Sequence, residues 1–221
     1  MANSALLKSS IAKKVAMALS GLFLMLFLAQ HFFINLTSVF SSDTFNQISH
    51  FMGNNPLVQF VIQPLLIVGV VFHFIMGIVL DFKNRAARPV SYAKYNGASN
   101  ASWASRNMII SGAVVLAFIL LHFYDFWVPE MVYKYVEVKP LDETRYFHEL
   151  AEKFESPVRT ALYCLSFGLL SLHLWHGFNS SFQSVGFNNK YSKALHKLGY
   201  AFAIIVPFGF IFIALFHHLN H

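Results

Sequence analysis

The sequence contains very little cysteine and very little charge. Of its 221 residues, one is cysteine and only 12% are charged. A single cysteine excludes an intramolecular disulfide, a cysteine-ligated iron–sulfur cluster held by this chain, and covalent haem attachment through a CxxCH motif. We expect the one cysteine, Cys164, to be a small packing residue, because it lies inside an apolar segment.

Acidic residues are also scarce, with 10 against 16 basic residues. The basic residues form no continuous stripe with interleaved aromatic residues, so nucleic acid is not an expected partner. Hydrophobic residues make up 56% of the chain, and its mean hydropathy of +0.52 lies outside the usual range of soluble globular proteins. The composition therefore predicts an integral membrane protein.

Five windows approach or exceed the ~20 apolar residues that a membrane-spanning helix requires: 15–40, 57–80, 107–128, 157–180 and 198–218. The first has the basic flank of a signal peptide, but its apolar run is too long and no small-x-small cleavage site follows, so we expect a retained helix. We identify no repeat, low-complexity tract or flexible linker. The prediction is one domain, 1–221, folded as an all-α bundle of five transmembrane helices.

Basic residues alternate between the connections, which predicts the topology. They precede the first window and lie in the second and fourth connections: Lys8, Lys13 and Lys14; Lys83, Arg85, Arg88, Lys94 and Arg106; Lys190, Lys193 and Lys197. The first connection has no Lys or Arg, and the third balances its bases with acids: Glu137, Asp142, Glu143, Glu149, Glu152 and Glu155. We therefore expect a cytoplasmic N-terminus and a C-terminus outside.

Two connections have further features. The second is rich in small polar residues around Asn96–Asn100, which suits contact with a soluble partner. In the third, Phe147, Leu150 and Phe154 recur at helical spacing, which predicts a short amphipathic helix over the outer end of the bundle. A capped surface loop is the alternative.

Four histidines lie in four different apolar windows, each about two thirds of the way along: His31, His73, His122 and His173. An ionisable side chain at that depth costs roughly 2.5 kcal/mol or more, so four at matching depths call for a ligand that uses imidazole. Haem iron is the leading candidate. Interhelical hydrogen bonding is the plainer alternative for any one of them.

The topology predicts which histidines lie at the same depth in the membrane, because the first and third helices run outward while the second and fourth run inward. His31 and His122 then share an outer layer, and His73 and His173 share an inner one, about 18 Å away along the membrane normal. Two imidazoles on facing helices in each layer are what two bis-histidine b-type haems require. The prediction is two haem b groups, with the four histidines as axial iron ligands.

Glycines beside the histidines could make room for a flat porphyrin. Gly69 and Gly77 lie four residues before and after His73, and Gly177 lies four after His173. His176 is a rival ligand, but its neighbours at the same spacing are Leu172 and Ser180, which clear less space, so His173 is preferred. The remaining histidines are expected to be solvated, although the last three could bind metal as a cluster: His50, His148, His196, His217, His218 and His221.

The chain resembles the single-subunit, five-helix, two-haem cytochrome b anchors of succinate dehydrogenases and fumarate reductases. The resemblance runs nearly end to end and is strongest in Lys13–Leu24, which leads to His31, and in Ser171–Ser180 with Phe182–Gly186. It implies the same two histidine pairs as haem ligands. It also implies a bacterial cytoplasmic (inner) membrane protein that acts in the tricarboxylic acid cycle and electron transport.

The resemblance further implies partners: an iron–sulfur subunit docked on the cytoplasmic face, a flavoprotein that holds the dicarboxylate site, and membrane quinone, expected to be menaquinone. Fumarate reductases of this family can carry a glutamate two positions before the fourth-helix ligand, where this chain has Ser171. Helix-borne acids are otherwise expected only at helix ends, at Asp81 and Asp125. Both observations favour succinate oxidation over fumarate reduction.

The quinone site is the least defined expectation. Candidates near the outer layer are Gln30, Asn35, His50 and Gln63, and those near the inner end are Arg106, Asn107 and Trp175. Arg106 and Arg159 begin the third and fourth helices, where a guanidinium can meet a haem propionate or a lipid headgroup.

Other function classes remain open at this point. One is a haem-free transporter or assembly scaffold with a histidine relay, against which stand the lack of a recognised repeat and of helices broken at midplane. Another is a different two-haem quinol cytochrome, such as the membrane subunit of a nitrate reductase or formate dehydrogenase, against which stands the use of four different helices for the ligands.

Overall fold

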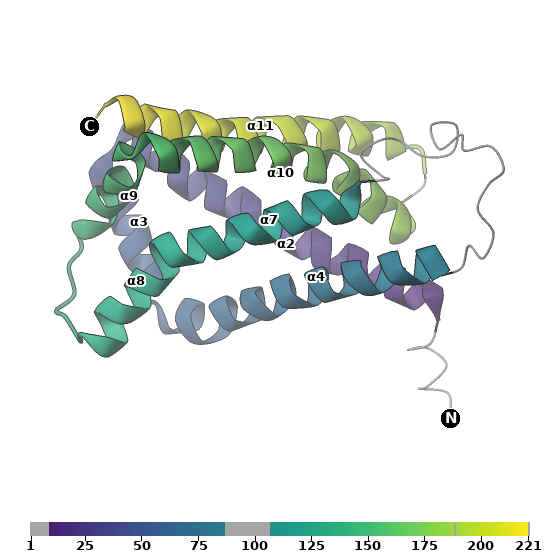
Figure 1. Ribbon diagram of the computed structural model, residues 1–221, viewed down its shortest axis with the longest axis horizontal. Coiled ribbons are helices and arrows are strands. Elements are labelled where there is room, and N and C mark those ends of the chain that lie inside the picture. Colours follow the sequence, from purple (N-terminus) through teal and green to yellow (C-terminus); the bar gives the residue numbers. More distant parts are fainter. Residues whose placement is uncertain (1–8, 87–106, 188, 221) are drawn as a thin grey trace.

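A computed structural model describes residues 9–86, 107–187 and 189–220. This part of the chain contains helices and no strand. Five long helical segments run side by side, and each is long and apolar enough to cross a membrane (Figure 1): Ser10–Phe40, Val58–Ala86, Met108–Val136, Pro157–Ser184 and Ser192–Leu219. The five predicted spans are confirmed. Each helix is longer than its apolar window because it continues into polar residues at one or both ends.

The first, fourth and fifth segments are continuous α-helices: α2 (Ser10–Phe40), α10 (Pro157–Ser184) and α11 (Ser192–Leu219). The second consists of a π-helical turn, η1 (Val58–Ile62), followed by α4 (Gln63–Ala86). The third begins as α7 and then alternates π- and α-helical turns: α7 (Met108–His122), η2 (Phe123–Trp127), α8 (Val128–Met131) and η3 (Val132–Val136). π-Helical turns are uncommon and are frequently found at functional sites.

The first connection contains a helix that the sequence analysis missed. α3 (Ser42–Asn54) follows α2 after Ser41, whose extended backbone (φ −158°) breaks the helix. The Ser41 hydroxyl accepts a hydrogen bond from the Thr44 amide at 3.1 Å, and Asp43 lies in the first turn, where the helix dipole favours negative charge. These signals are local and are present in the sequence.

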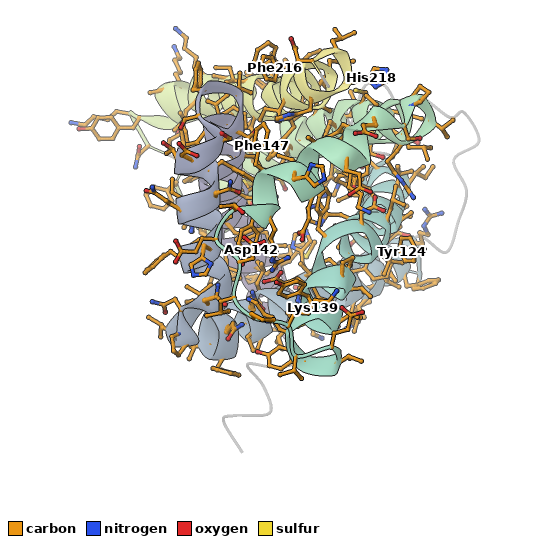
Figure 2. The ribbon with its side chains drawn as sticks, turned by 90° about the vertical axis from the view of Figure 1, so that its left-hand side faces the viewer. Tyr124, Lys139, Asp142, Phe147, Phe216 and His218 are labelled. Atoms are coloured by element: carbon orange, nitrogen blue, oxygen red, sulfur yellow. The ribbon has the colours of Figure 1, made fainter. Side chains whose placement is uncertain are left out.

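The third connection contains α9 (Arg145–Glu155), the amphipathic helix predicted there. Leu150 and Phe154 are buried, and Phe147 packs against the same core. α9 contacts α3, α10 and α11, so these two short helices cover one end of the bundle (Figure 2). We call this the α3–α9 end.

Four of the long segments form a ring in which α2 packs against α4 and α10, and α7 packs against α4 and α10. α2 and α7 therefore face each other across one diagonal of the ring, and α4 and α10 across the other. α11 lies outside this ring against α10 and α2. Where α10 meets α11, Phe167 and Phe210 stack at 5.1 Å. One turn earlier on α10, Tyr163 is 2% exposed against Phe118 of α7 and Phe154 of α9.

Large apolar side chains cover the outer surface of the bundle. On the second segment they include Phe60, Leu65, Val68, Val71 and Ile75, and no residue of α4 is buried within the chain. Exposed apolar surface on this scale is typical of a lipid-facing or partner-facing surface.

Two expectations about polar residues are wrong. Asp125 lies within the third segment, in η2, and is 3% exposed, because the helix continues for about two turns beyond the predicted span. His217 is 3% exposed and not solvated, because α11 remains packed to its C-terminal end and the Ser38 hydroxyl on α2 lies 2.8 Å from its Nε2 atom. Of the other histidines expected to be solvated, His148 is exposed, while His50, His196 and His218 are half-buried; His221 lies outside the described residues.

Candidate functional site

His31 and His122 meet across the α2–α7 diagonal. Their ring centroids are 5.7 Å apart. Aromatic rings enclose the pair: Phe27 stacks on His31 at 5.4 Å, and Phe118 and Phe126 lie 6.2 and 5.2 Å from His122. The depth argument predicted this pairing, and the structure brings the two rings together.

His73 and His173 meet across the α4–α10 diagonal, with ring centroids 6.5 Å apart. Gly21 on α2 lies beside His73, and Gly21 precedes His31 by ten residues. At about 1.5 Å per residue, the two histidine pairs are therefore separated by about 15 Å along α2. This is close to the separation predicted from the sequence.

The spacing within each pair fits a metal held between two imidazoles. A metal–imidazole nitrogen bond is about 2 Å long and the ring centre lies about 1 Å behind the nitrogen, so two rings on opposite sides of one metal have centres about 6 Å apart. The observed 5.7 and 6.5 Å bracket this value. Because each pair spans a diagonal of the ring, its two histidines come from helices that are not direct neighbours in the bundle.

Serine hydroxyls on the neighbouring helices contact both histidines of the second pair. The Ser20 hydroxyl on α2 lies 2.9 Å from His73 Nδ1, and the Ser111 hydroxyl on α7 lies 3.1 Å from His173 Nδ1. Both contacts engage Nδ1 and leave Nε2 as the ring nitrogen available to a metal. Metal-binding histidines commonly make such a hydrogen bond through the other ring nitrogen.

Glycines beside this pair differ from those expected. A Cβ atom at Gly21 would lie 3.3 Å from His73 Cε1, and one at Gly112 would lie 3.6 Å from His173 Cε1. The glycines selected from the sequence face neighbouring helices instead: a Cβ at Gly69 would lie 2.9 Å from the Phe23 ring, and those at Gly77 and Gly177 would contact Met17 and Met108 at 3.6 and 3.8 Å. Only Gly69 lies in a close helix contact, and none of these three Cβ positions lies within 4 Å of an imidazole.

The missed residues had a signal in the sequence. α2 and α7 carry the same pattern, Met-x-x-Ser-Gly-x5-Phe-x3-His, although no repeat was recognised: Met17, Ser20, Gly21, Phe27 and His31; Met108, Ser111, Gly112, Phe118 and His122. A helix has 3.6 residues per turn, so the serine and the histidine, 11 residues apart, lie on the same face. Each helix thus presents one histidine to one pair and one serine to the other pair.

The rival ligand, His176, is half-buried on α10, one turn after His173. The ring that faces His73 is that of His173. The preference for His173 therefore agrees with the geometry. Gly177 does not explain that preference, because a Cβ atom there would contact Met108 and not an imidazole.

A groove lies between the start of the second segment and the third segment, near the α3–α9 end. Its volume is about 230 Å³, and it is lined by Gln59, Phe60, Gln63, Pro64, Ile67, Trp127, Met131 and Tyr135. Two amides and a phenol on an otherwise apolar wall suit a flat apolar ring with carbonyl or hydroxyl groups. Of the quinone candidates named from the sequence, only Gln63 lines it.

The other quinone candidates are dispersed. The Gln30 amide points to Met52 Sδ at 3.9 Å, and Asn35 donates to the His31 carbonyl at 2.8 Å. His50 lies on α3, 3.8 Å from Glu143. Trp175 stacks on Tyr200 of α11 at 4.3 Å. Asn107 precedes α7, and Arg106 lies outside the described residues.

Arg159, considered for a haem propionate, lies 3.5 Å from the buried Asp125 carboxylate. The Tyr163 hydroxyl donates to the other oxygen of Asp125 at 2.8 Å. Asp125 lies three residues after His122, so the Asp125–Arg159 pair begins within one helical turn of the first histidine pair.

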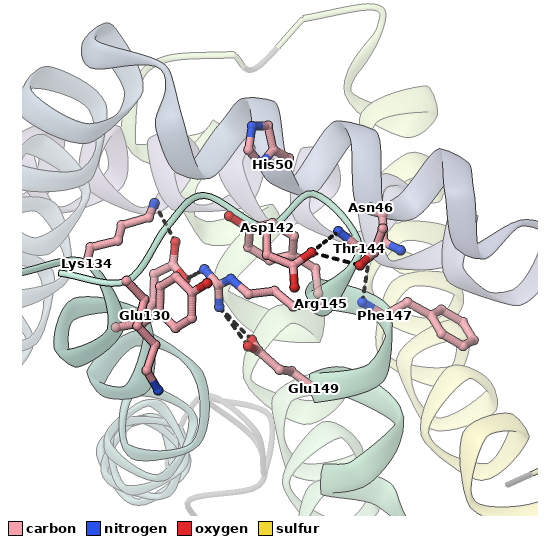
Figure 3. Close-up of polar contacts among 12 residues, drawn as sticks. Asn46, His50, Glu130, Lys134, Asp142, Thr144, Arg145, Phe147 and Glu149 are labelled. Atoms are coloured by element: carbon pink, nitrogen blue, oxygen red, sulfur yellow. Dashed lines mark hydrogen bonds and ion pairs between the residues drawn. The ribbon is translucent and has the colours of Figure 1, made fainter. Parts of the chain in front are cut away.

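A charged cluster joins α8, η3, α9 and α3 at the α3–α9 end (Figure 3). Arg145 pairs with Glu130 and with Glu149, the latter at 2.7 Å, and its guanidinium lies over the rings of Tyr133 and Tyr146 at 4.1 and 4.3 Å. Burial alone would lower the pKa of Arg145, but the hydrogen bonds to the two carboxylates outweigh it and raise the pKa.

Lys134 extends this cluster: it pairs with Glu130 at 2.5 Å and donates to the Gly53 carbonyl at 2.5 Å. The cluster thus ties the third segment to both capping helices. Sequence analysis assigned no role to it, because its members lie far apart along the chain.

No known family model, curated protein or solved structure matches this chain.

Proposed function

We propose that this chain is the cytochrome b membrane anchor of a succinate:quinone oxidoreductase, holding two haem b groups with His31 and His122 as ligands of one and His73 and His173 as ligands of the other. The observation that carries the proposal is the meeting of four intramembrane histidines in two pairs, each across a diagonal of the same helical ring. A bound haem supplies an iron centre that accepts and releases one electron.

The chain's own residues would perform three tasks in this role. The histidines would hold the two haems between rigid helices, and the two histidine pairs are about 15 Å apart by the helical rise between Gly21 and His31. The surrounding apolar and aromatic side chains exclude water, which helps set the potential of each centre. Two centres at different depths provide a route for electrons across the membrane.

The groove beside Gln59 and Gln63 is the position that we propose for the quinone. Trp127 and Tyr135 offer aromatic surface against which the quinone ring can pack. The side-chain amides of Gln59 and Gln63 can donate hydrogen bonds to the quinone oxygen atoms. Menaquinone remains the expected species because of the family resemblance.

The preference for succinate oxidation over fumarate reduction rests on Ser171. Its second basis is lost, because Asp125 lies within the third segment and is buried. Ser171 is itself buried and donates to the Ala203 carbonyl on α11 at 2.6 Å, so no acid occupies that position. A fumarate reductase anchor is the closest alternative.

We expect the purified protein to contain two non-covalent haems per chain, because it has two histidine pairs and no CxxCH motif. Haem and protein are to be quantified before and after extraction with acidified acetone, which should remove all the haem. A ratio of one haem per folded chain would contradict the two-pair assignment, and a ratio of zero would favour a haem-free transporter or scaffold.

The same purification tests the partners. An iron–sulfur subunit and a flavoprotein, identified by mass spectrometry, would distinguish this anchor from the membrane subunits of nitrate reductases and formate dehydrogenases.

We propose a cytoplasmic N-terminus, with the iron–sulfur subunit docked on the face that carries the second and fourth connections. Cross-links from Lys83, Lys94 or Lys190 to that subunit are the expected result, because positively charged connections remain in the cytoplasm. In intact cells, an impermeant amine reagent should leave these lysines unmodified. Their modification from outside would reverse the topology.

A further inference from the structure

Ser20 and Ser111 each contact a backbone carbonyl as well as an imidazole. The Ser20 hydroxyl donates to the Met17 carbonyl at 2.8 Å, and that of Ser111 donates to the Met108 carbonyl at 3.0 Å. A hydroxyl has one proton, so an oxygen that donates to its carbonyl accepts at its contact with the imidazole. Nδ1 of each imidazole is then the protonated nitrogen, and Nε2 holds the free lone pair.

Repetition of this arrangement is an independent indication that it is not an incidental contact. The two serines occupy the same place in the Met-x-x-Ser-Gly-x5-Phe-x3-His pattern of α2 and α7. Each glycine that follows the serine lies against the same imidazole, at 3.3 Å for Gly21 and 3.6 Å for Gly112 from the Cβ position to Cε1. Hydroxyl and glycine thus approach His73 and His173 in the same way.

The two histidine pairs differ in this respect. Phenyl rings of Phe27, Phe118 and Phe126 lie against His31 and His122. The polar group beside His31 is the Asn35 amide nitrogen, 3.5 Å from Nδ1 and 3.4 Å from Nε2, and an amide nitrogen is a donor. Hydroxyl oxygens, which can accept, lie 2.9 and 3.1 Å from Nδ1 of His73 and His173. An acceptor on Nδ1–H raises the basicity of Nε2, and a more basic ligand favours ferric over ferrous iron.

We infer that Ser20 and Ser111 are positioning residues for the His73–His173 pair. They select the tautomer and ring orientation that would present both Nε2 atoms to one iron. They also lower the reduction potential of that centre and leave the potential of the other centre unchanged. This inference rests on the proposed function, since it assigns residues to one of its two haems.

The test is redox titration of the purified complex with Ser20→Ala and Ser111→Ala. We expect each change to weaken the preference of this centre for ferric iron by about tenfold, a rise of about 59 mV for one electron, with the other haem unchanged. His73→Leu, which lacks this haem, identifies its signal. Ser20→Thr and Ser111→Thr keep a hydroxyl and should keep the native potential.

Ser38→Ala is the matched control. Ser38 is also on α2, donates to a carbonyl three residues back at 2.6 Å and contacts a histidine, but that histidine is His217. The Ser38→Ala variant should therefore leave the reduction potential of the His73–His173 centre unchanged. Equal shifts in Ser38→Ala and Ser20→Ala, or native potentials in both Ser20→Ala and Ser111→Ala, would overturn the inference.

Nitrogen-15 NMR of the imidazoles in haem-depleted protein provides a readout that does not depend on the haem. We expect Nδ1 of His73 and His173 to be protonated in the native chain and in the threonine variants, with mixed tautomers in the alanine variants. Protonation at Nε2 in the native chain would overturn the inference. If the native protein binds no haem, the proposed function fails, and these spectra separately report whether the serines set the tautomers.

Discussion

His73→Leu and His173→Leu should each remove the same haem and spare the other, whereas His31→Leu and His122→Leu should each remove the second. The reason is that, under the proposed assignment, each substitution would remove one of the two histidines that would hold that haem. Loss of the ligand also leaves a partner imidazole unpaired in an apolar interior, so we expect reduced assembly as well. Haem content, visible spectra and redox titrations of the four variants should fall into two groups.

The matched control is His176→Leu, one turn from His173 on the same helix, which should retain both haems. If His176→Leu loses a haem and His173→Leu does not, His176 is the ligand. If His73→Leu gives the spectrum of His31→Leu, the pairing across the diagonals is incorrect.

Arg145→Met should destabilise the α3–α9 end by about 1–3 kcal/mol, because it removes hydrogen bonds to Glu130 and Glu149 while Lys134 still pairs with Glu130. The Arg145 side chain is 10% exposed and Glu130 is 16% exposed, so the remaining carboxylate is poorly solvated. Removal of the guanidinium also abolishes its contacts with Glu149 and with the rings of Tyr133 and Tyr146. Unfolding of the detergent-solubilised protein by added denaturant, followed by circular dichroism, measures the loss.

Arg85→Met removes an arginine of the same kind from an exposed pair and serves as the control. Arg85 is 67% exposed and lies 2.7 Å from Asp81 one turn earlier on α4. Exposed pairs of this type contribute about 0–1 kcal/mol, so stability should hardly change. Equal losses in the two variants would show that the cluster at the α3–α9 end does not secure the capping helices.

The sequence by itself determined the number of spans, the helical class, the amphipathic α9 and the depth of each histidine. These properties follow from hydrophobic run length and from a fixed rise per residue, which act along the chain and need no knowledge of neighbours. Depth combined with alternating direction was also sufficient to pair His31 with His122 and His73 with His173.

Only the tertiary structure decided what surrounds each histidine. Which helices are neighbours and which face each other across a diagonal depends on packing angles, and these placed Ser20 beside His73 and Phe23 beside Gly69. Burial of Asp125 and His217 likewise required helices that continue past their apolar windows and remain packed. Hydrophobic patterning fixes position along the membrane normal, whereas contacts within a layer are set by side-chain fit between helices distant in sequence.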